Sequence, residues 1–190
     1  MAVVLVGLLA CSSTDGSGSV GVPRKALLAL ARFDSANPSS PATFVFKKNE
    51  LKTFPIRHTD ASQSLFAEFT FTPSSVLSRN DTILADTSTV VVTVSIAPGS
   101  YEFVLGPATL GFNIAGEPVV TLYYPRYGNL AVFDSSPQYA SAAAFEQALA
   151  LWYERAPDAW VRTRNSAHPG ASQVASALSA PGHYLIAAPK

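Results

Sequence analysis

The side chains that could perform acid–base chemistry are few in this chain. Three histidines occur, at positions 58, 168 and 183, together with a single cysteine. His58 stands two residues before Asp60, and a histidine held by a carboxylate can act as the general base for a serine nucleophile. No Gly-x-Ser-x-Gly elbow, phosphate-binding loop or His-Glu-x-x-His motif accompanies the pair. We therefore expect His58 in a surface turn, and we predict no catalytic residue.

The other histidines and the aspartates form no metal-binding pattern. His168 precedes Pro169-Gly170, which indicates a loop, and His183 is expected at the exposed end of a strand. One cysteine with three scattered histidines does not make a zinc site, and the aspartates lack the spacing of a calcium loop. We predict neither a metal nor a cofactor.

Tyrosines suggest a binding surface instead. Tyrosine together with serine and asparagine is typical of adaptable recognition surfaces, and Asn129 and Ser136 lie close to the tyrosines in the sequence. We expect an exposed aromatic cluster that consists of Tyr123, Tyr124, Tyr127 and Tyr139.

Composition limits the partners of the chain. The 190 residues include 13 basic and 13 acidic ones, so the formal net charge is zero and no basic field for nucleic acid exists. Charged residues make up 14%, against about 25% in typical domains. The length is enough for one ordinary domain, which we place at residues 23–190.

The pattern along the chain predicts an all-β fold, an antiparallel β-sandwich. Residues 89–96 place Val90, Val92, Val94 and Ile96 on one face and Val91, Thr93 and Ser95 on the other, as a half-buried strand does. In residues 64–72 the alternation has one apolar exception, Phe66, on the polar face. Trp152 and Trp160 are expected as anchors in the core or between the sheets. The remaining expected strands are residues 101–105, 119–124, 129–133, 159–163, 173–178 and 184–187.

Three segments are less regular. Residues 141–155 are rich in Ala, Leu and Glu, so we expect one short helix at 141–147 followed by a strand from Ala148. Residues 24–32 fit either a helical turn or a first strand. For residues 44–54 the pattern leaves open whether they pair into the main sheet or form an added hairpin.

The N-terminal residues form an apolar run that stops at the only cysteine. Residues 2–10 have the length of the apolar part of a signal peptide and about half the length of a membrane span. The run ends in Leu8-Leu9-Ala10-Cys11 and is followed by a Ser/Gly-rich stretch. This resembles the lipobox of bacterial lipoproteins. The resemblance implies a signal peptide at 1–10, lipid attachment to Cys11, and a flexible tether over 11–22.

The resemblance also implies a location. Ser12 after the cysteine is similar to the outer-membrane sorting signal of lipoproteins, so we expect a lipid-anchored protein of the bacterial cell envelope, in the outer membrane. Signal peptides begin with a basic residue and none precedes Cys11, so we expect the true start of the chain upstream. The alternative is a short buried strand that contains a cysteine.

Three landmarks occur in order along residues 64–188. The first is Phe-Thr-Pro-Ser-Ser-Val-Leu at 71–77, and the second is Tyr-Glu-Phe-Val-Leu-Gly-Pro-Ala-Thr-Leu-Gly-Phe at 101–112 followed by Pro118-Val119. The third is Leu-Ala-Leu-Trp-Tyr at 149–153, with Trp160 and the segments 174–178 and 184–186 after it. Together they resemble the ZU5-type β-sandwich of bacterial envelope lipoproteins, as a divergent member.

Some ZU5 domains cleave their own chain at a His-Phe-Ser sequence through the serine hydroxyl. When Tyr184 is placed on the family tyrosine, Ala180-Pro181-Gly182 occupies that position. The nucleophile is missing, so we predict no self-cleavage.

Three functions remain open at this point. The first is a non-enzymatic envelope lipoprotein that binds an unknown envelope protein or glycan, or that has a structural role. The second is a carbohydrate-binding or adhesion module, which predicts an exposed aromatic row. The third is a hydrolase with a loop-based serine and histidine, which needs a pocket that holds one of the histidines.

Overall fold

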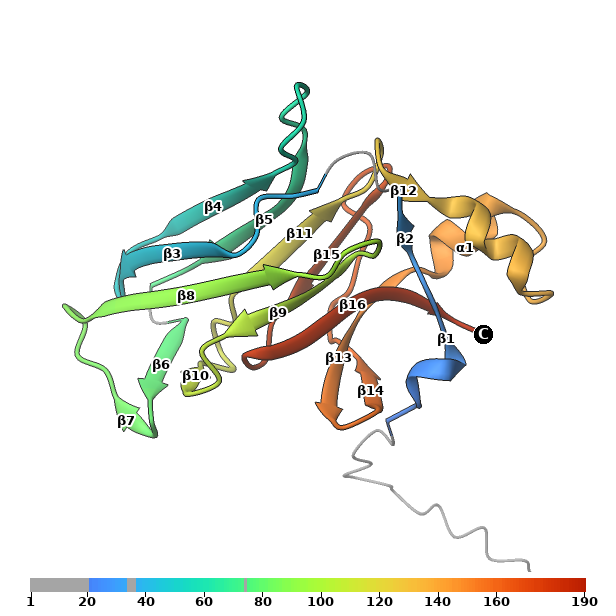
Figure 1. Ribbon diagram of the computed structural model, residues 1–190. Coiled ribbons are helices and arrows are strands. Elements are labelled where there is room, and N and C mark those ends of the chain that lie inside the picture. Colours follow the sequence, from blue (N-terminus) through green and yellow to red (C-terminus); the bar gives the residue numbers. More distant parts are fainter. Residues whose placement is uncertain (1–20, 34–36, 74) are drawn as a thin grey trace, which may run out of the picture.

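A computed structural model describes residues 21–33, 37–73 and 75–190. They form an antiparallel β-sandwich of two main sheets, which Figure 1 shows as two layers. The seven-stranded sheet has the order β14-β13-β16-β9-β8-β3, with β1 paired to β16, and the four-stranded sheet has the order β15-β11-β5-β4.

The bounds of the strands in the seven-stranded sheet are β1 (Leu27–Ala29), β3 (Ala42–Lys47), β8 (Thr89–Ile96), β9 (Glu102–Gly106), β13 (Ala150–Ala156), β14 (Ala159–Arg162) and β16 (Gly182–Pro189). Those of the four-stranded sheet are β4 (Lys52–Arg57), β5 (Leu65–Phe71), β11 (Val119–Tyr123) and β15 (Gln173–Ala177). Short pieces complete the fold: β2 (Ala31–Arg32) with β12 (Gly128–Asn129), and β6 (Val76–Arg79) with β7 (Thr82–Ile83) and β10 (Leu110–Phe112). The helical elements are η1 (Arg24–Ala26), η2 (Leu130–Ser135) and α1 (Ala142–Ala148).

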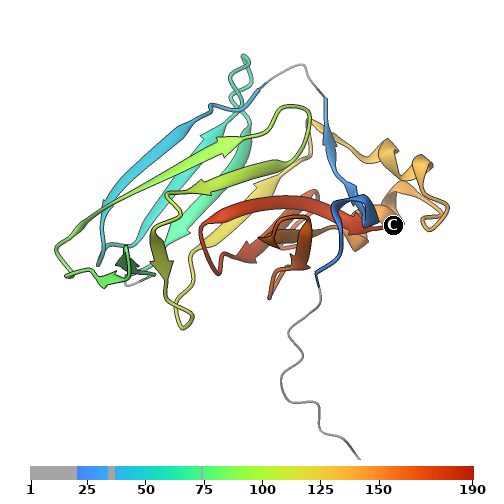
Figure 2. The ribbon, with the colours of Figure 1, turned by 60° about the horizontal axis from the view of Figure 1, so that its bottom comes forward.

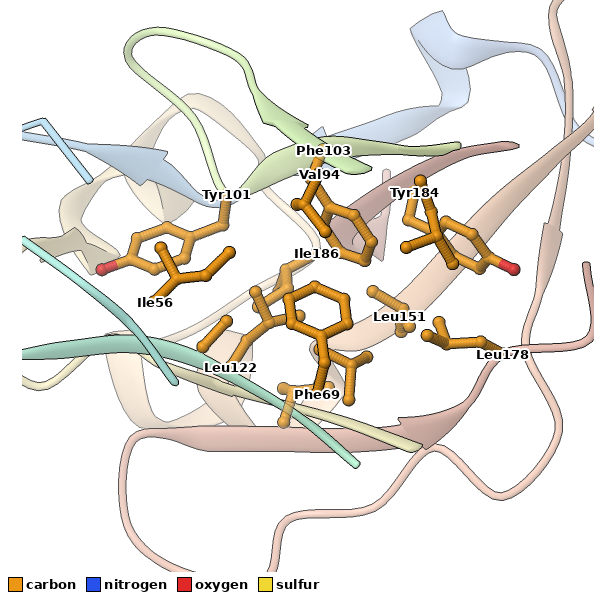
Figure 3. Packing of buried hydrophobic residues seen from close by; sticks show 14 of the residues in the cluster. Ile56, Phe69, Val94, Tyr101, Phe103, Leu122, Leu151, Leu178, Tyr184 and Ile186 are labelled. Atoms are coloured by element: carbon orange, nitrogen blue, oxygen red, sulfur yellow. The ribbon is translucent and has the colours of Figure 1, made fainter. Parts of the chain in front are cut away.

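The strand pattern of the sequence explains the core between the sheets. Val90, Val92 and Val94 of β8 are fully buried, as their alternation predicts. Phe69 of β5 meets Phe103 of β9 edge to face, with ring centroids 5.4 Å apart. Figure 3 shows side chains of both sheets meeting in this layer. Aromatic and aliphatic packing therefore joins the two sheets.

A β-bulge corrects the expectation for Phe66. Ile56 pairs with Ala67 and Arg57 pairs with Leu65, so Phe66 is the extra residue on β5. Such a residue breaks the alternation of faces, and Phe66 is fully buried against the ring of Tyr101, 5.3 Å away.

The segment 44–54 is divided between the two sheets. β3 pairs with β8 along its whole length, and β4 pairs with β5. The turn between β3 and β4 therefore joins one sheet to the other at the far edge of the sandwich. Residues 44–54, whose pairing the sequence left open, therefore belong to both main sheets.

The helical segments η2 and α1 lie together beside the sandwich, as Figure 1 shows; α1 contacts β16, and η2 contacts α1 and β1. Ser141 caps α1 by accepting a hydrogen bond from the Ala144 amide, and β13 follows the helix, so the expected helix-to-strand change is confirmed. The expected strand at 129–133 is wrong. Asn129 accepts a hydrogen bond from the Ala131 amide, which favours the helical turns of η2.

The N-terminal described residues contain both of the structures expected for 24–32, a helical turn and then short strands. β1 pairs with the end of β16, and Figure 2 shows this blue segment beside the red strand. A small second cluster lies on the outer face of this sheet and contains Leu27, Trp152, Trp160 and Leu185. The tryptophans are thus buried as expected, but outside the inter-sheet core. No helix in the described part of the chain is long and apolar enough to span a membrane.

Candidate functional site

A pocket of about 340 Å³ opens at one lateral edge of the sandwich. It lies where β13 and β14 of one sheet face β15 of the other, and Thr163 and Ser176 link the two sides through their hydroxyls, 2.6 Å apart. Its lining consists of Ile114, Glu117, Tyr153, Arg155, Val161, Arg162, Thr163, Arg164, Ala177 and Ser179. We call it the arginine pocket.

Three arginines give this pocket its chemical character. Arg155, Arg162 and Arg164 form no ion pair and no side-chain hydrogen bond within the described ranges. Cross-strand pairing puts Val161 opposite Tyr153 on the inner face, and Arg162 opposite Trp152 on the outer face. A β-bulge between Glu154 and Ala156 makes Arg155 the extra residue of β13, so alternation does not fix its face. Arg155, Arg162 and Arg164 are exposed where they line the pocket.

A second group of charges lies on the outer face of the seven-stranded sheet. His183 Nδ1 is 2.8 Å from Glu154 Oε2, and its Nε2 is 2.6 Å from Glu102 Oε1. Carboxylates only accept hydrogen bonds, so both ring nitrogens donate and the imidazole is the cation. The hydrogen bond to Glu102 raises the pKa of His183, and the same bond lowers the pKa of Glu102.

The neighbours of His183 hold its ring within the fold. Trp160 contacts the imidazole edge to face at 5.0 Å, and Arg24 pairs with Glu102 at 3.5 Å. His183 lies at the start of β16, as expected, but its side chain is only 31% exposed, because it lies between two carboxylates. Within residues 21–33, 37–73 and 75–190, no group of three His, Cys, Asp or Glu side chains is placed to hold a metal ion.

His58 also differs from its expectation, because it is buried. Its ring packs on Tyr127 at 4.3 Å and edge to face on Phe66 at 5.8 Å. The Tyr127 hydroxyl donates to Asp60, and this bond holds the pKa of the Asp60 carboxyl below its usual value. His58 is therefore packed between Tyr127 and Phe66. The surface turn predicted for His58 is wrong.

The expected exposed tyrosine cluster is also wrong. Tyr124, Tyr127 and Tyr139 are 2%, 6% and 9% exposed. The four tyrosine rings lie in different parts of the fold. Tyr124 lies against Tyr101, and the Tyr139 hydroxyl donates to the Pro189 carbonyl at 2.6 Å. Tyr123 donates to Glu68, and burial raises its pKa to about 12. Tyr124, Tyr127 and Tyr139 are thus part of the packed fold and do not form an exposed surface.

A smaller pocket of about 250 Å³ contains His168, Ser172 and Glu146. His168 lies in an exposed loop, as expected, and its Nε2 donates to the Leu149 carbonyl at 2.9 Å. Ser172 donates to Glu146 at 3.2 Å. The serine is therefore bonded to the acid and the histidine to the backbone, which is not the chain of bonds that activates a serine nucleophile.

The lipidation site Cys11, the signal peptide at 1–10 and residues 12–20 of the tether lie outside the described residues. The arginine pocket was not foreseen from the sequence, although one signal was present. Three of the eight arginines fall within residues 155–164. The Glu102–His183–Glu154 group had no such signal, because its members are far apart in sequence and meet only through strand pairing.

Comparisons with protein-family models, with curated proteins and with solved structures found no match for this chain.

Proposed function

We propose that this chain is a lipoprotein of a bacterial cell envelope, in which lipidated Cys11 anchors a non-enzymatic β-sandwich that binds a ligand. The observation that carries this proposal is the order of Leu8-Leu9-Ala10-Cys11, a Ser/Gly-rich stretch, and then a folded sandwich. A thiol is the strongest nucleophile in the N-terminal segment, and the small Ala10 leaves room for a peptidase to cut before it. The ZU5-type resemblance belongs to the same proposal, and so does the outer membrane implied by Ser12.

Physical chemistry favours stable anchoring in this arrangement. One acyl chain holds a protein on a membrane only marginally, whereas two or three hold it stably. From Cys11 to Val22 the backbone spans eleven residue steps, which reach at most roughly 40 Å. The sandwich would therefore work close to the membrane surface.

The two other functions have less support. A carbohydrate module that stacks sugars needs an exposed aromatic row, but among the described residues the exposed large hydrophobic side chains are aliphatic except Phe33. A serine hydrolase needs a histidine bonded to its nucleophile, and the bonds of His168 and Ser172 lead elsewhere. The arginine pocket has three arginines and no histidine in its lining, which favours binding over acid–base catalysis.

Detergent phase separation tests the anchoring. The wild type, expressed in a bacterium behind its native upstream region, should enter the detergent phase and sediment with membranes. Cys11→Ser should remain in the aqueous phase, and Ser12→Ala, which keeps the lipidated thiol, should behave like the wild type in this assay. Equal partition of the wild type and Cys11→Ser would reject the proposal.

A further inference from the structure

The arginine pocket has the features of a site for an anionic small molecule. Its volume of about 340 Å³ is within the range of ligand pockets, roughly 300–1,000 Å³. The whole chain has no net charge, yet the pocket gathers three arginines and one glutamate. Arginine remains charged at every physiological pH, and its planar fork matches a carboxylate with two parallel hydrogen bonds.

The three arginines are available to a ligand. Lys48 is buried and pairs with Asp86 at 3.2 Å, whereas Arg155, Arg162 and Arg164 are exposed at the pocket. Arg155, Arg162 and Arg164 have no such partner among the described residues. Like charges in one pocket repel one another, so an anion that binds between them would relieve that repulsion.

Glu117 and the other lining residues narrow the class of ligand. Glu117 also forms no ion pair among the described residues, although it shares the pocket with arginines. A free carboxylate accepts hydrogen bonds from hydroxyl groups and repels a dianion more than a monoanion. Tyr153 and Val161 supply an apolar floor on the inner face, and Ser179 adds a hydroxyl. Together these groups suit a small monoanion that carries hydroxyls.

We propose that the arginine pocket binds a sugar acid, a small carbohydrate with one carboxylate. The three arginines that line the pocket attract the carboxylate, with Arg155 as a hydrogen-bond donor to it, and Glu117 accepts hydrogen bonds from the ligand hydroxyls. This inference names a ligand class for the binding role proposed above, on which it rests. The pocket would recognise the sugar acid by charge and hydrogen bonds and not by stacking of an aromatic ring on the sugar.

Calorimetric titration tests this site with a matched pair of probes, D-galacturonate and D-galactose, which differ in the carboxylate. The titrated protein is the full chain with Cys11→Ser, so the result does not depend on the lipid anchor. Galacturonate should bind and galactose should not. Arg155→Gln should weaken galacturonate binding at least about tenfold, as the loss of a charged hydrogen bond does.

Two further variants separate electrostatics from altered folding. Glu117→Gln removes a repelling charge but keeps a carbonyl oxygen that accepts hydrogen bonds from the ligand hydroxyls, so galacturonate binding should become several-fold stronger. Arg57→Gln, in β4 at the opposite edge of the four-stranded sheet, should leave binding unchanged. An opposite sign for the Glu117 and Arg155 variants cannot arise from general destabilisation. Circular dichroism confirms that each variant is folded.

Three results would overturn the inference. They are no binding of galacturonate, equal binding of galactose, and binding of inorganic phosphate as tight as that of galacturonate. The third would mean a general anion site. None of these results would touch membrane anchoring, which the partition of Cys11→Ser tests separately.

Discussion

Val22 and Trp160 exchange two backbone hydrogen bonds, each 2.8 Å long, and so join the first described residues to strand β14. The next contacts strengthen this junction, because the Arg24 amide donates to Asp158 at 2.6 Å. Arg162, which lines the arginine pocket, is on the same strand two residues after Trp160, and Arg164 follows just beyond the strand. The proposed tether and the proposed binding site therefore meet on the same strand, and the pocket would be held close to the membrane.

Gly21→Ala tests this junction. A Cβ atom at Gly21 would lie 2.8 Å from the carbonyl carbon of Ala159, so the segment must shift away from β14. We expect a local loss of about 1–2 kcal/mol, seen as faster hydrogen exchange of the Val22 and Trp160 amides. Gly116→Ala is the control, because its Cβ would be 3.7 Å from Thr72. Unchanged exchange in Gly21→Ala would contradict the docking of this segment.

Phe66→Ala tests the bulge in β5. If Phe66 pointed to solvent, as simple alternation predicts, its truncation would cost less than about 0.5 kcal/mol. In the bulged strand it is fully buried, so we expect a loss of about 3–5 kcal/mol in the free energy of unfolding. Urea denaturation measures the difference, and Phe69→Ala, on the regular part of the same strand, should cost a similar amount.

His183 should make stability depend on pH. Its pKa is raised above 6.5 in the folded state, so its contribution is complete below about pH 6.5 and is lost as pH rises through the folded-state pKa. The lowered pKa of Glu102 has its effect at acidic pH. The contribution of this carboxylate to stability is present above about pH 4.5 and is lost as pH falls through its folded-state pKa.

Urea unfolding of the wild type and His183→Gln between pH 5.5 and 9 measures this dependence. The wild type should lose stability with rising pH relative to His183→Gln. Parallel curves for the wild type and His183→Gln would contradict the carboxylate clamp around His183.

Tyr127→Phe should raise the pKa of Asp60. The hydrogen bond from the Tyr127 hydroxyl is the main cause of the lowered pKa, and phenylalanine cannot donate one. An NMR titration of the Asp60 carboxyl carbon measures the shift. Tyr139→Phe, which loses a bond to a backbone carbonyl instead, should leave Asp60 unchanged.

The strands could be predicted where the side-chain alternation is regular. β8 has the predicted bounds, and the helix-to-strand change before β13 follows from residue propensities. Phe66 could not be predicted to point inward, because a bulge depends on the register of β4 and β5. Burial of His58 and Tyr127 also depends on the packing of distant segments. Residue type alone therefore predicts a surface position for His58 and Tyr127, although both are buried.

The candidate sites depended even more on tertiary structure. The segment 123–139 has the residue composition of a recognition surface, yet most of its tyrosines are buried in the fold. The arginine pocket forms only because β14 and β15, which have no direct pairing, lie at the same edge. A group of nearby arginines was visible in the sequence, but the cavity that they line was not.

The most direct test of the account is the intact mass of the protein extracted from membranes of a bacterium that expresses it from its native upstream region. We expect a chain that begins at Cys11 and carries added acyl chains, and we expect no such species from Cys11→Ser. An unacylated wild type with a mass that includes residues before Cys11 would contradict this expectation.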